Sequence, residues 1–127
     1  MSIAARDFTV GGETYSLLYN ARARWLFERA SGYPLGDLKS FRGSFSDVEL
    51  VHLLVAGLEG HRLRSEPKAK PWTADRVLDD LIGDCDATDR AAIYRGVMEA
   101  HTAAFEGLPE PDETADDDAE GNAAETS

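Results

Sequence analysis

The sequence predicts a mainly α domain of the α+β class, in which an N-terminal β-hairpin packs on a small bundle of about four helices. Three observations support this prediction. The first twenty residues alternate apolar and polar side chains around a Gly-Gly pair. Helix-capping residues then precede apolar runs of helical length. Past Gly107 the composition changes to Glu, Asp, Ala, Pro, Thr and Ser, so we expect one globular domain over residues 1–108 and a disordered acidic tail over residues 109–127.

The negative charge of the chain is concentrated in this tail. The formal net charge is −11, yet residues 1–108 contain 13 basic and only 16 acidic residues. The tail has no Lys or Arg, and it lacks the aromatic and branched apolar residues that could offset the entropy of ordering. We expect it to keep the protein soluble or to mask a basic surface, on the chain itself or on a partner. Its acidic residues are Glu110, Asp112, Glu113, Asp116, Asp117, Asp118, Glu120 and Glu125.

Residues 6–19 have the pattern of a β-hairpin. Gly11-Gly12 supply the positive φ angles that a two-residue turn requires. A hairpin alone is only marginally stable in water, so its apolar face needs a helix to cover it. The apolar positions of the two predicted strands are Phe8, Val10, Tyr15 and Leu17.

A short helix is predicted over residues 21–31. Asn20 can cap it, because the side-chain oxygen of Asn can accept a hydrogen bond from an amide of the first turn. Gly32 suits the left-handed position that ends a helix, and Pro34 prevents its continuation. Phe27 falls outside the predicted buried stripe, so we expect it to pack against the next segment or to be exposed. The stripe consists of Ala21, Trp25, Leu26 and Ala30.

The next helix is predicted to be the core helix of the domain. Ser46 and Glu49 have the spacing of a capping box, in which each side chain bonds the backbone amide of the other residue. Residues 50–58 are apolar nearly all round, which is typical of a central helix or of one in a groove between two other elements. We expect His52, within this run, to be hydrogen-bonded at the edge of the core and not a ligand.

A polar loop follows over residues 61–70, with the sequence HRLRSEPKAK. Four basic residues in this loop could contact a nucleic-acid backbone. Glu66 interrupts them, however, and prolines at 67 and 71 keep the segment irregular. A solvated connector is therefore the favoured interpretation.

Two more helices complete the predicted bundle. Thr73 can cap a helix that runs to about Ile82, and a second cap at Asp86 or Thr88 can open a helix through about Phe105. The residues that we expect to be buried are Val77, Leu78, Leu81 and Ile82 in the first helix, and Ala92, Ile93, Val97, Ala100, Ala104 and Phe105 in the second.

The sequence does not predict an enzyme. It contains no nucleophile elbow, phosphate-binding loop or dinucleotide fingerprint. His52, His61 and His101 are too far apart to form a recognised metal motif, and Cys85 is the only cysteine. We therefore expect no catalytic residue, no metal site and no cofactor. No segment has the length of an apolar signal sequence or membrane span, so we expect a cytoplasmic protein that binds no membrane.

Several short motifs follow one another in a characteristic order over residues 8–105. They are a hairpin that ends in an aromatic and apolar strand, an Asn20-Ala21 helix start, Glu28 followed by Gly32 and Leu35, and Leu54-Val55-Ala56-Gly57-Leu58. In this order they resemble the small tail assembly chaperones of long-tailed bacteriophages, most closely the group that includes gene-transfer-agent proteins. The resemblance rests on patterned apolar and turn residues, and it does not include the acidic tail.

The resemblance implies a function that is not enzymatic. Such chaperones bind the long, helical tape measure protein, keep it soluble for assembly of the tail tube, and are absent from the mature particle. The tail tube protein and a second copy of the chain are further expected partners, and nucleic acid is not one. Binding of amphipathic helices requires an adaptable apolar groove. The candidate contact residues are Trp25, Phe27, Tyr33, Leu35 and Phe41.

Two other functions remain open from the sequence. The chain could be a small acidic regulator that mimics nucleic acid or masks a basic protein, with the tail as its active part. It could also be a minor structural component of the particle. Whether a longer form arises by ribosomal frameshifting is not visible in a protein sequence.

Overall fold

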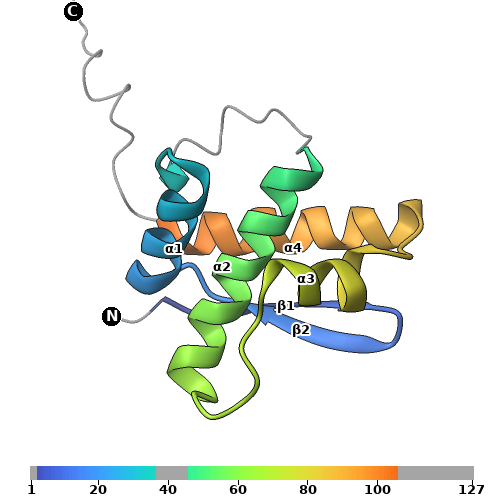
Figure 1. Cartoon of the computed structure of the whole chain (residues 1–127), viewed down its shortest axis with the longest axis horizontal. Coiled ribbons are helices and arrows are strands. Elements are labelled where there is room, and N and C mark those ends of the chain that lie inside the picture. The colour runs from blue at the N-terminus through green and yellow to red at the C-terminus, as the bar shows by residue number, and fades with distance from the viewer. Residues whose placement is uncertain (1–2, 37–45, 106–127) are drawn as a thin grey trace, which may run out of the picture.

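The computed structural model describes residues 3–36 and 46–105 (Figure 1). A two-stranded antiparallel hairpin is followed by helices, as the sequence predicts. The tail and Phe41 lie outside the described residues. The elements in chain order are β1 (Arg6–Val10), β2 (Glu13–Leu17), α1 (Ala21–Ser31), α2 (Asp47–Ser65), α3 (Ala74–Val77), the π-helical turn η2 (Leu78–Ile82) and α4 (Ala87–Phe105).

The hairpin closes through the predicted glycine turn. Gly11 and Gly12 have φ angles of 60° and 82°, so both adopt the left-handed region that a two-residue turn needs. Phe8 pairs with Tyr15 across the strands, and their rings stack with centroids 5.6 Å apart. Gly96 of α4 lies so close to Phe8 that an added Cβ would be 2.9 Å from the Phe8 ring. The hairpin is therefore covered on its apolar face by α4, which crosses behind α2 in Figure 1.

Both predicted ends of α1 are confirmed. The side-chain oxygen of Asn20 accepts a hydrogen bond from the Ala23 amide at 3.0 Å, and Gly32 ends the helix with a φ angle of 87°. The predicted buried stripe is wrong, because the buried residues are Ala23 and Phe27. Trp25 lies two residues from each, about 200° around the helix. Burial of Phe27 therefore turns Trp25 toward solvent.

Helix α2 is the core helix, as predicted. Ser46 and Glu49 form the capping box, with the Glu49 amide 3.1 Å from the Ser46 hydroxyl and the Ser46 amide 3.0 Å from the Glu49 carboxylate. The helix packs against α1, β2 and α3. It continues to Ser65, so the prediction that residues 61–70 form a loop is wrong for residues 61–65. A Cβ added at Gly60 would collide with the carbonyl oxygen of Leu18, so this glycine permits the chain between β2 and α1 to lie directly on α2.

The C-terminal helices depart from the prediction at three residues, because Leu78 is exposed and Ala92 and Phe105 are only half-buried. Thr73 caps α3 as predicted, and Asp86 provides the cap of α4 by accepting a hydrogen bond from the Asp89 amide at 2.9 Å. Within η2 the Gly83 amide donates to the Leu78 carbonyl at 2.8 Å, a spacing of five residues. This wider turn changes the helical phase, so Leu78 is 42% exposed although it was predicted to be buried. The predicted burial of Val77, Leu81 and Ile82 is confirmed.

Candidate protein-binding surfaces

The structure separates the predicted contact residues into different environments. Phe27 and Leu35 are fully buried, so the prediction that they offer exposed apolar contacts is wrong. Trp25 is 49% exposed, and Tyr33 is half-buried. Phe41 lies outside the described residues. Of the four described residues in this group, Trp25 is the one whose side chain is exposed to a partner. The side chain of Tyr33 is only partly exposed.

Phe27 and Leu35 are buried because α1 and the turn after it fold back on the rest of the domain. The Phe27 ring packs edge-on against Tyr33, with centroids 5.5 Å apart. The Leu35 amide lies 3.4 Å from the Glu28 carboxylate, and its carbonyl oxygen lies 3.1 Å from Nε2 of His101. Glu28, one of the residues of the family resemblance, therefore contacts the backbone of the following turn.

Trp25 is the centre of a basic and aromatic surface on α1. The guanidinium carbon of Arg29 lies 5.0 Å from the centre of the indole ring, and that of Arg22 lies 5.8 Å from it. Such cation–π contacts contribute about 0.5–1 kcal/mol each at exposed sites. We call Arg22, Trp25 and Arg29 the Arg–Trp–Arg surface.

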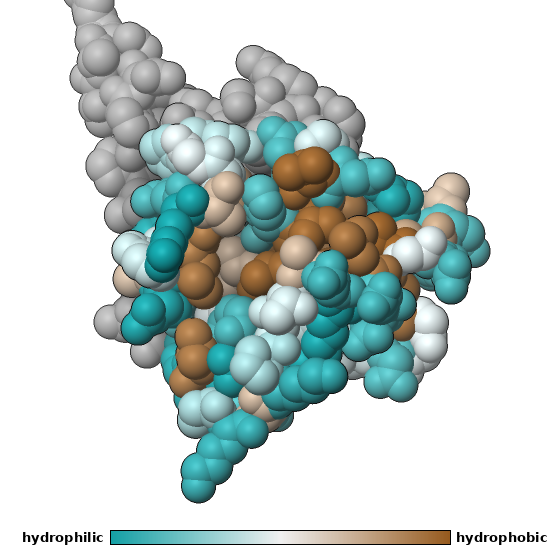
Figure 2. All heavy atoms as spheres, in the orientation of Figure 1, coloured by the Kyte–Doolittle hydropathy of each residue, from teal (hydrophilic) through white to brown (hydrophobic). Residues whose placement is uncertain are grey.

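A second exposed surface lies on the outer face of α2 and extends toward α3. Val48 is 65% exposed, Val55 is half-buried, and the two residues share a helix face because they are seven positions apart. Leu78, rotated outward by the π turn, contributes a third apolar side chain. Figure 2 shows an apolar band on this side of the molecule, over α2 and toward α3. We call Val48, Val55 and Leu78 the α2–α3 apolar surface.

Sequence reasoning missed the α2–α3 apolar surface, although a signal for it was present. Residues 50–58 are apolar nearly all round α2, and His52 and Val55 are the two of them that are not buried. Val48 lies between the two capping-box residues Ser46 and Glu49, outside the apolar run. Leu78 could not have been found, because its exposure depends on the hydrogen-bond spacing of η2.

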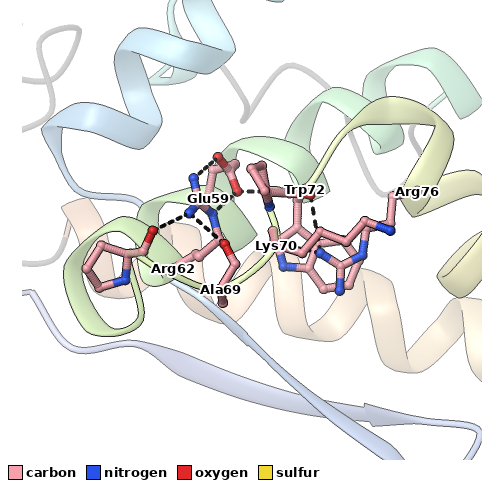
Figure 3. Close-up of polar contacts among 8 residues, drawn as sticks. Glu59, Arg62, Ala69, Lys70, Trp72 and Arg76 are labelled. Atoms are coloured by element: carbon pink, nitrogen blue, oxygen red, sulfur yellow. Dashed lines mark hydrogen bonds and ion pairs between the residues drawn. The ribbon is translucent and has the colours of Figure 1, made fainter.

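A buried ion pair organises the loop between α2 and α3 (Figure 3). The Arg62 guanidinium donates two hydrogen bonds to the Glu59 carboxylate, at 2.6 and 2.8 Å. Its Nη1 also donates to the carbonyl oxygens of Pro67 and Ala69, at 2.9 and 3.1 Å. The Trp72 amide donates to Glu59 at 2.8 Å. These bonds satisfy both charged groups and fix the course of the loop, so the pair is structural.

The same network ends at a second tryptophan. The guanidinium carbon of Arg76 lies 3.7 Å from the centre of the Trp72 ring, and Nη1 of Arg76 donates to the Lys70 carbonyl at 2.8 Å. The Trp72 ring meets Tyr15 of β2 edge-on, with centroids 5.9 Å apart. The loop is therefore held between α2, α3 and the hairpin.

This arrangement weakens the nucleic-acid interpretation of the loop. Arg62 is buried in the ion pair, and Arg64 donates to the carbonyl oxygen of Ile3 at 3.1 Å. Two of the four basic side chains in residues 61–70 are thus engaged within the domain. Lys68 and Lys70 alone form a small positive patch, and phosphate-binding surfaces need clustered charge.

The titratable groups of the core have structural roles. The Tyr19 hydroxyl donates to the Leu53 carbonyl at 2.8 Å, and burial raises the pKa of Tyr19 above its ordinary value. Burial lowers the pKa of His101, although its hydrogen bond to the Leu35 carbonyl acts in the opposite direction. No three His, Cys, Asp or Glu side chains gather as metal ligands within residues 3–36 and 46–105.

No protein-family model, curated protein or solved structure matches this chain. The resemblance to tail assembly chaperones therefore remains a prediction from residue patterns. None of the helices that the structure describes is both long enough and apolar enough to cross a bilayer.

Proposed function

We propose that this chain is a tail assembly chaperone of a long-tailed phage, a prophage or a gene-transfer agent. It acts in the host cytoplasm without catalysis, binds the tape measure protein and keeps it soluble until the tail tube has formed around it. It is then absent from the mature particle. The order of motifs from the hairpin to α2 supports this proposal on the sequence side.

The α2–α3 apolar surface is the observation that carries the proposal. Val48 and Val55 share one face of α2, and Leu78 is an exposed apolar side chain of η2, which directly follows α3. An amphipathic helix recognises such a surface through apolar residues spaced three or four apart, and a tape measure protein is a long series of such helices. Asp75 and Asp79 are exposed beside this surface and favour solubility of the complex.

The proposal predicts a tape measure gene near the gene for this chain, and co-expression of the two proteins tests it. We expect the chain to raise the soluble fraction of the tape measure protein and to co-purify with it. The double variant Val48→Asp/Leu78→Asp should lose both effects, because two carboxylates would have to be desolvated against an apolar helix. Both residues are exposed, so the variant should still fold.

Met98→Asp is the matched control. Met98 is 42% exposed, like Leu78, but it lies on α4 beside Arg6 and Thr102, away from the α2–α3 apolar surface. We expect this variant to retain tape measure binding. Equal binding by the double variant and the wild type would contradict the proposed site, and an insoluble tape measure protein in every case would contradict the proposed function.

The composition of the acidic tail favours one alternative function, a regulator that mimics nucleic acid or masks a basic protein. A full-length variant with its eight tail carboxylates changed to amides distinguishes the two. A mimic loses its partner with this change, whereas a chaperone that binds through α2 and α3 keeps the tape measure protein. Detection of the chain in purified particles would instead support a structural component.

A further inference from the structure

The Arg–Trp–Arg surface is a basic site without an acidic partner. Neither Arg22 nor Arg29 forms an ion pair or hydrogen bond with a carboxylate in the part of the chain that the structure describes. Each guanidinium has five N–H donors, and the indole of Trp25 adds one more. The site thus presents unused donors on an exposed helix face, which is opposite to the buried Phe27.

The charge of α1 differs from that of its surroundings. It carries three arginines and one glutamate, whereas residues 1–108 as a whole have three more acidic than basic residues. Around the α2–α3 apolar surface, by contrast, Asp75, Asp79 and Asp80 are exposed. An acidic segment is therefore attracted to α1 and repelled from α3.

The C-terminal end of α4 lies beside the end of α1. His101 is 3.1 Å from the Leu35 carbonyl, and the position of a Cβ on Gly36 is 3.8 Å from the Phe105 ring. Figure 1 shows the end of α4 passing next to α1. Residues 106–127 follow from this point. An extended chain covers about 3.3 Å per residue, and α1 is only roughly 16 Å long, so this segment can reach the whole of α1.

We propose that the acidic tail, residues 109–127, docks on the Arg–Trp–Arg surface of its own chain. Its carboxylates accept hydrogen bonds from the guanidinium groups of Arg22 and Arg29 and from the indole N–H of Trp25. The tether supplies a high effective concentration, which offsets the small stability of each exposed ion pair. This inference does not depend on the proposed chaperone function.

Nuclear magnetic resonance of the full-length protein tests this contact directly. The chain has only two tryptophans, so two indole N–H resonances are expected, and Trp25→Phe identifies which belongs to Trp25. We compare the wild type with the full-length variant whose eight tail carboxylates are changed to amides. The Trp25 resonance should shift between the two proteins, whereas that of Trp72 should not.

Salt and surface variants define the chemistry of the contact. At about 1 M salt, charge–charge attraction is screened beyond about 3 Å, so the tail should leave α1. The wild-type Trp25 resonance should then move to the position seen in the amide variant. Arg22→Gln/Arg29→Gln should abolish the tail-dependent shift. Arg6→Gln/Arg95→Gln, which removes two exposed arginines from β1 and α4, is the matched control and should preserve it.

Two outcomes would overturn the proposal. An identical Trp25 resonance in the wild type and the amide variant would show that the tail does not dock on α1. A shift that grows with protein concentration would assign the contact to the tail of a second copy, since docking within one chain is independent of concentration. A concentration-independent shift that the Arg22 and Arg29 variant removes would establish the proposed contact.

Discussion

Trp25 and Trp72 both lie against an arginine, yet they belong to opposite kinds of surface. At Trp72 the guanidinium carbon of Arg76 is 3.7 Å from the ring centre, and the same group donates to the carbonyl oxygens of Lys70 and Pro71. At Trp25 the nearest guanidinium carbon, that of Arg29, is 5.0 Å away. No described carboxylate forms an ion pair with Arg29.

The difference shows that a cation–π contact by itself does not reveal the role of a tryptophan. The remaining N–H groups of the arginine distinguish the two cases. Around Trp72, backbone carbonyls use them, and the result is a fixed loop. Around Trp25 no acceptor in residues 3–36 and 46–105 uses them, which is why we propose a negatively charged segment as their partner. Four changes to the protein test this contrast.

Glu59→Ala should have the largest effect on stability. It removes the acceptor of Arg62 and of the Trp72 amide, which leaves a buried cation without its carboxylate and a partly buried N–H group without an acceptor. We expect the midpoint of thermal unfolding to fall by about 10 °C. Circular dichroism measures it. Glu99→Ala, at an exposed glutamate of α4, is the control and should change the midpoint little. Equal midpoints would show that the network is dispensable.

Trp72→Ala should lower the free energy of unfolding by about 2 kcal/mol. This is less than the loss expected at a fully buried tryptophan, because the Trp72 side chain is half-buried. It loses the contacts with Tyr15 and Arg76. Urea unfolding followed by circular dichroism gives the free energy. Trp72→Phe retains a ring and should recover most of the loss. A free energy within about 0.5 kcal/mol of wild type for Trp72→Ala would contradict the role assigned to this residue.

Acidification should weaken the Glu59 network. Burial tends to raise the pKa of Glu59, but the hydrogen bonds from Arg62 and the Trp72 amide outweigh it and hold the pKa below its usual value. Stabilisation from this carboxylate is therefore present above about pH 4.3 and is lost as the pH falls through the lowered pKa. Thermal midpoints between pH 6 and pH 3 should decline more steeply in the wild type than in Glu59→Gln. Parallel curves would exclude this linkage.

Trp25→Ala should have the smallest effect, within about 0.5 kcal/mol of wild type. The side chain is 49% exposed, and its two arginine contacts are individually weak. The same urea experiment as for Trp72→Ala gives a direct comparison of the two tryptophans. A loss as large as that of Trp72→Ala would mean that Trp25 is structural, and the proposed docking site would lose its basis.

Much of the fold followed from local sequence signals. Asn20, Gly32 and the Ser46–Glu49 box were predicted correctly, because a cap joins groups within about four residues and its geometry hardly depends on the rest of the chain. The Gly11-Gly12 turn was predicted for the same reason. The candidate contact residues were predicted less well, since among the four that the structure describes only Trp25 is clearly exposed.

The sequence by itself thus determined the hairpin turn, both ends of α1 and the starts of α2 and α3, and it placed Ile93, Val97, Ala100 and Ala104 of α4 in the core. It did not determine the end of α2, which continues to Ser65 through residues that were expected to lie in a loop. Only the tertiary structure decided which side of α1 faces inward. Helix α1 has two similar apolar stripes, one with Ala23 and Phe27 and the other with Ala21 and Trp25. The stripe with Ala23 is the buried one because Ala23 fits against Gly60 of α2. The outward turn of Leu78 depends likewise on one backbone hydrogen bond. Packing and backbone hydrogen bonding depend on the whole chain. They therefore decide which side of a helix is buried where the local sequence pattern fits two sides equally well.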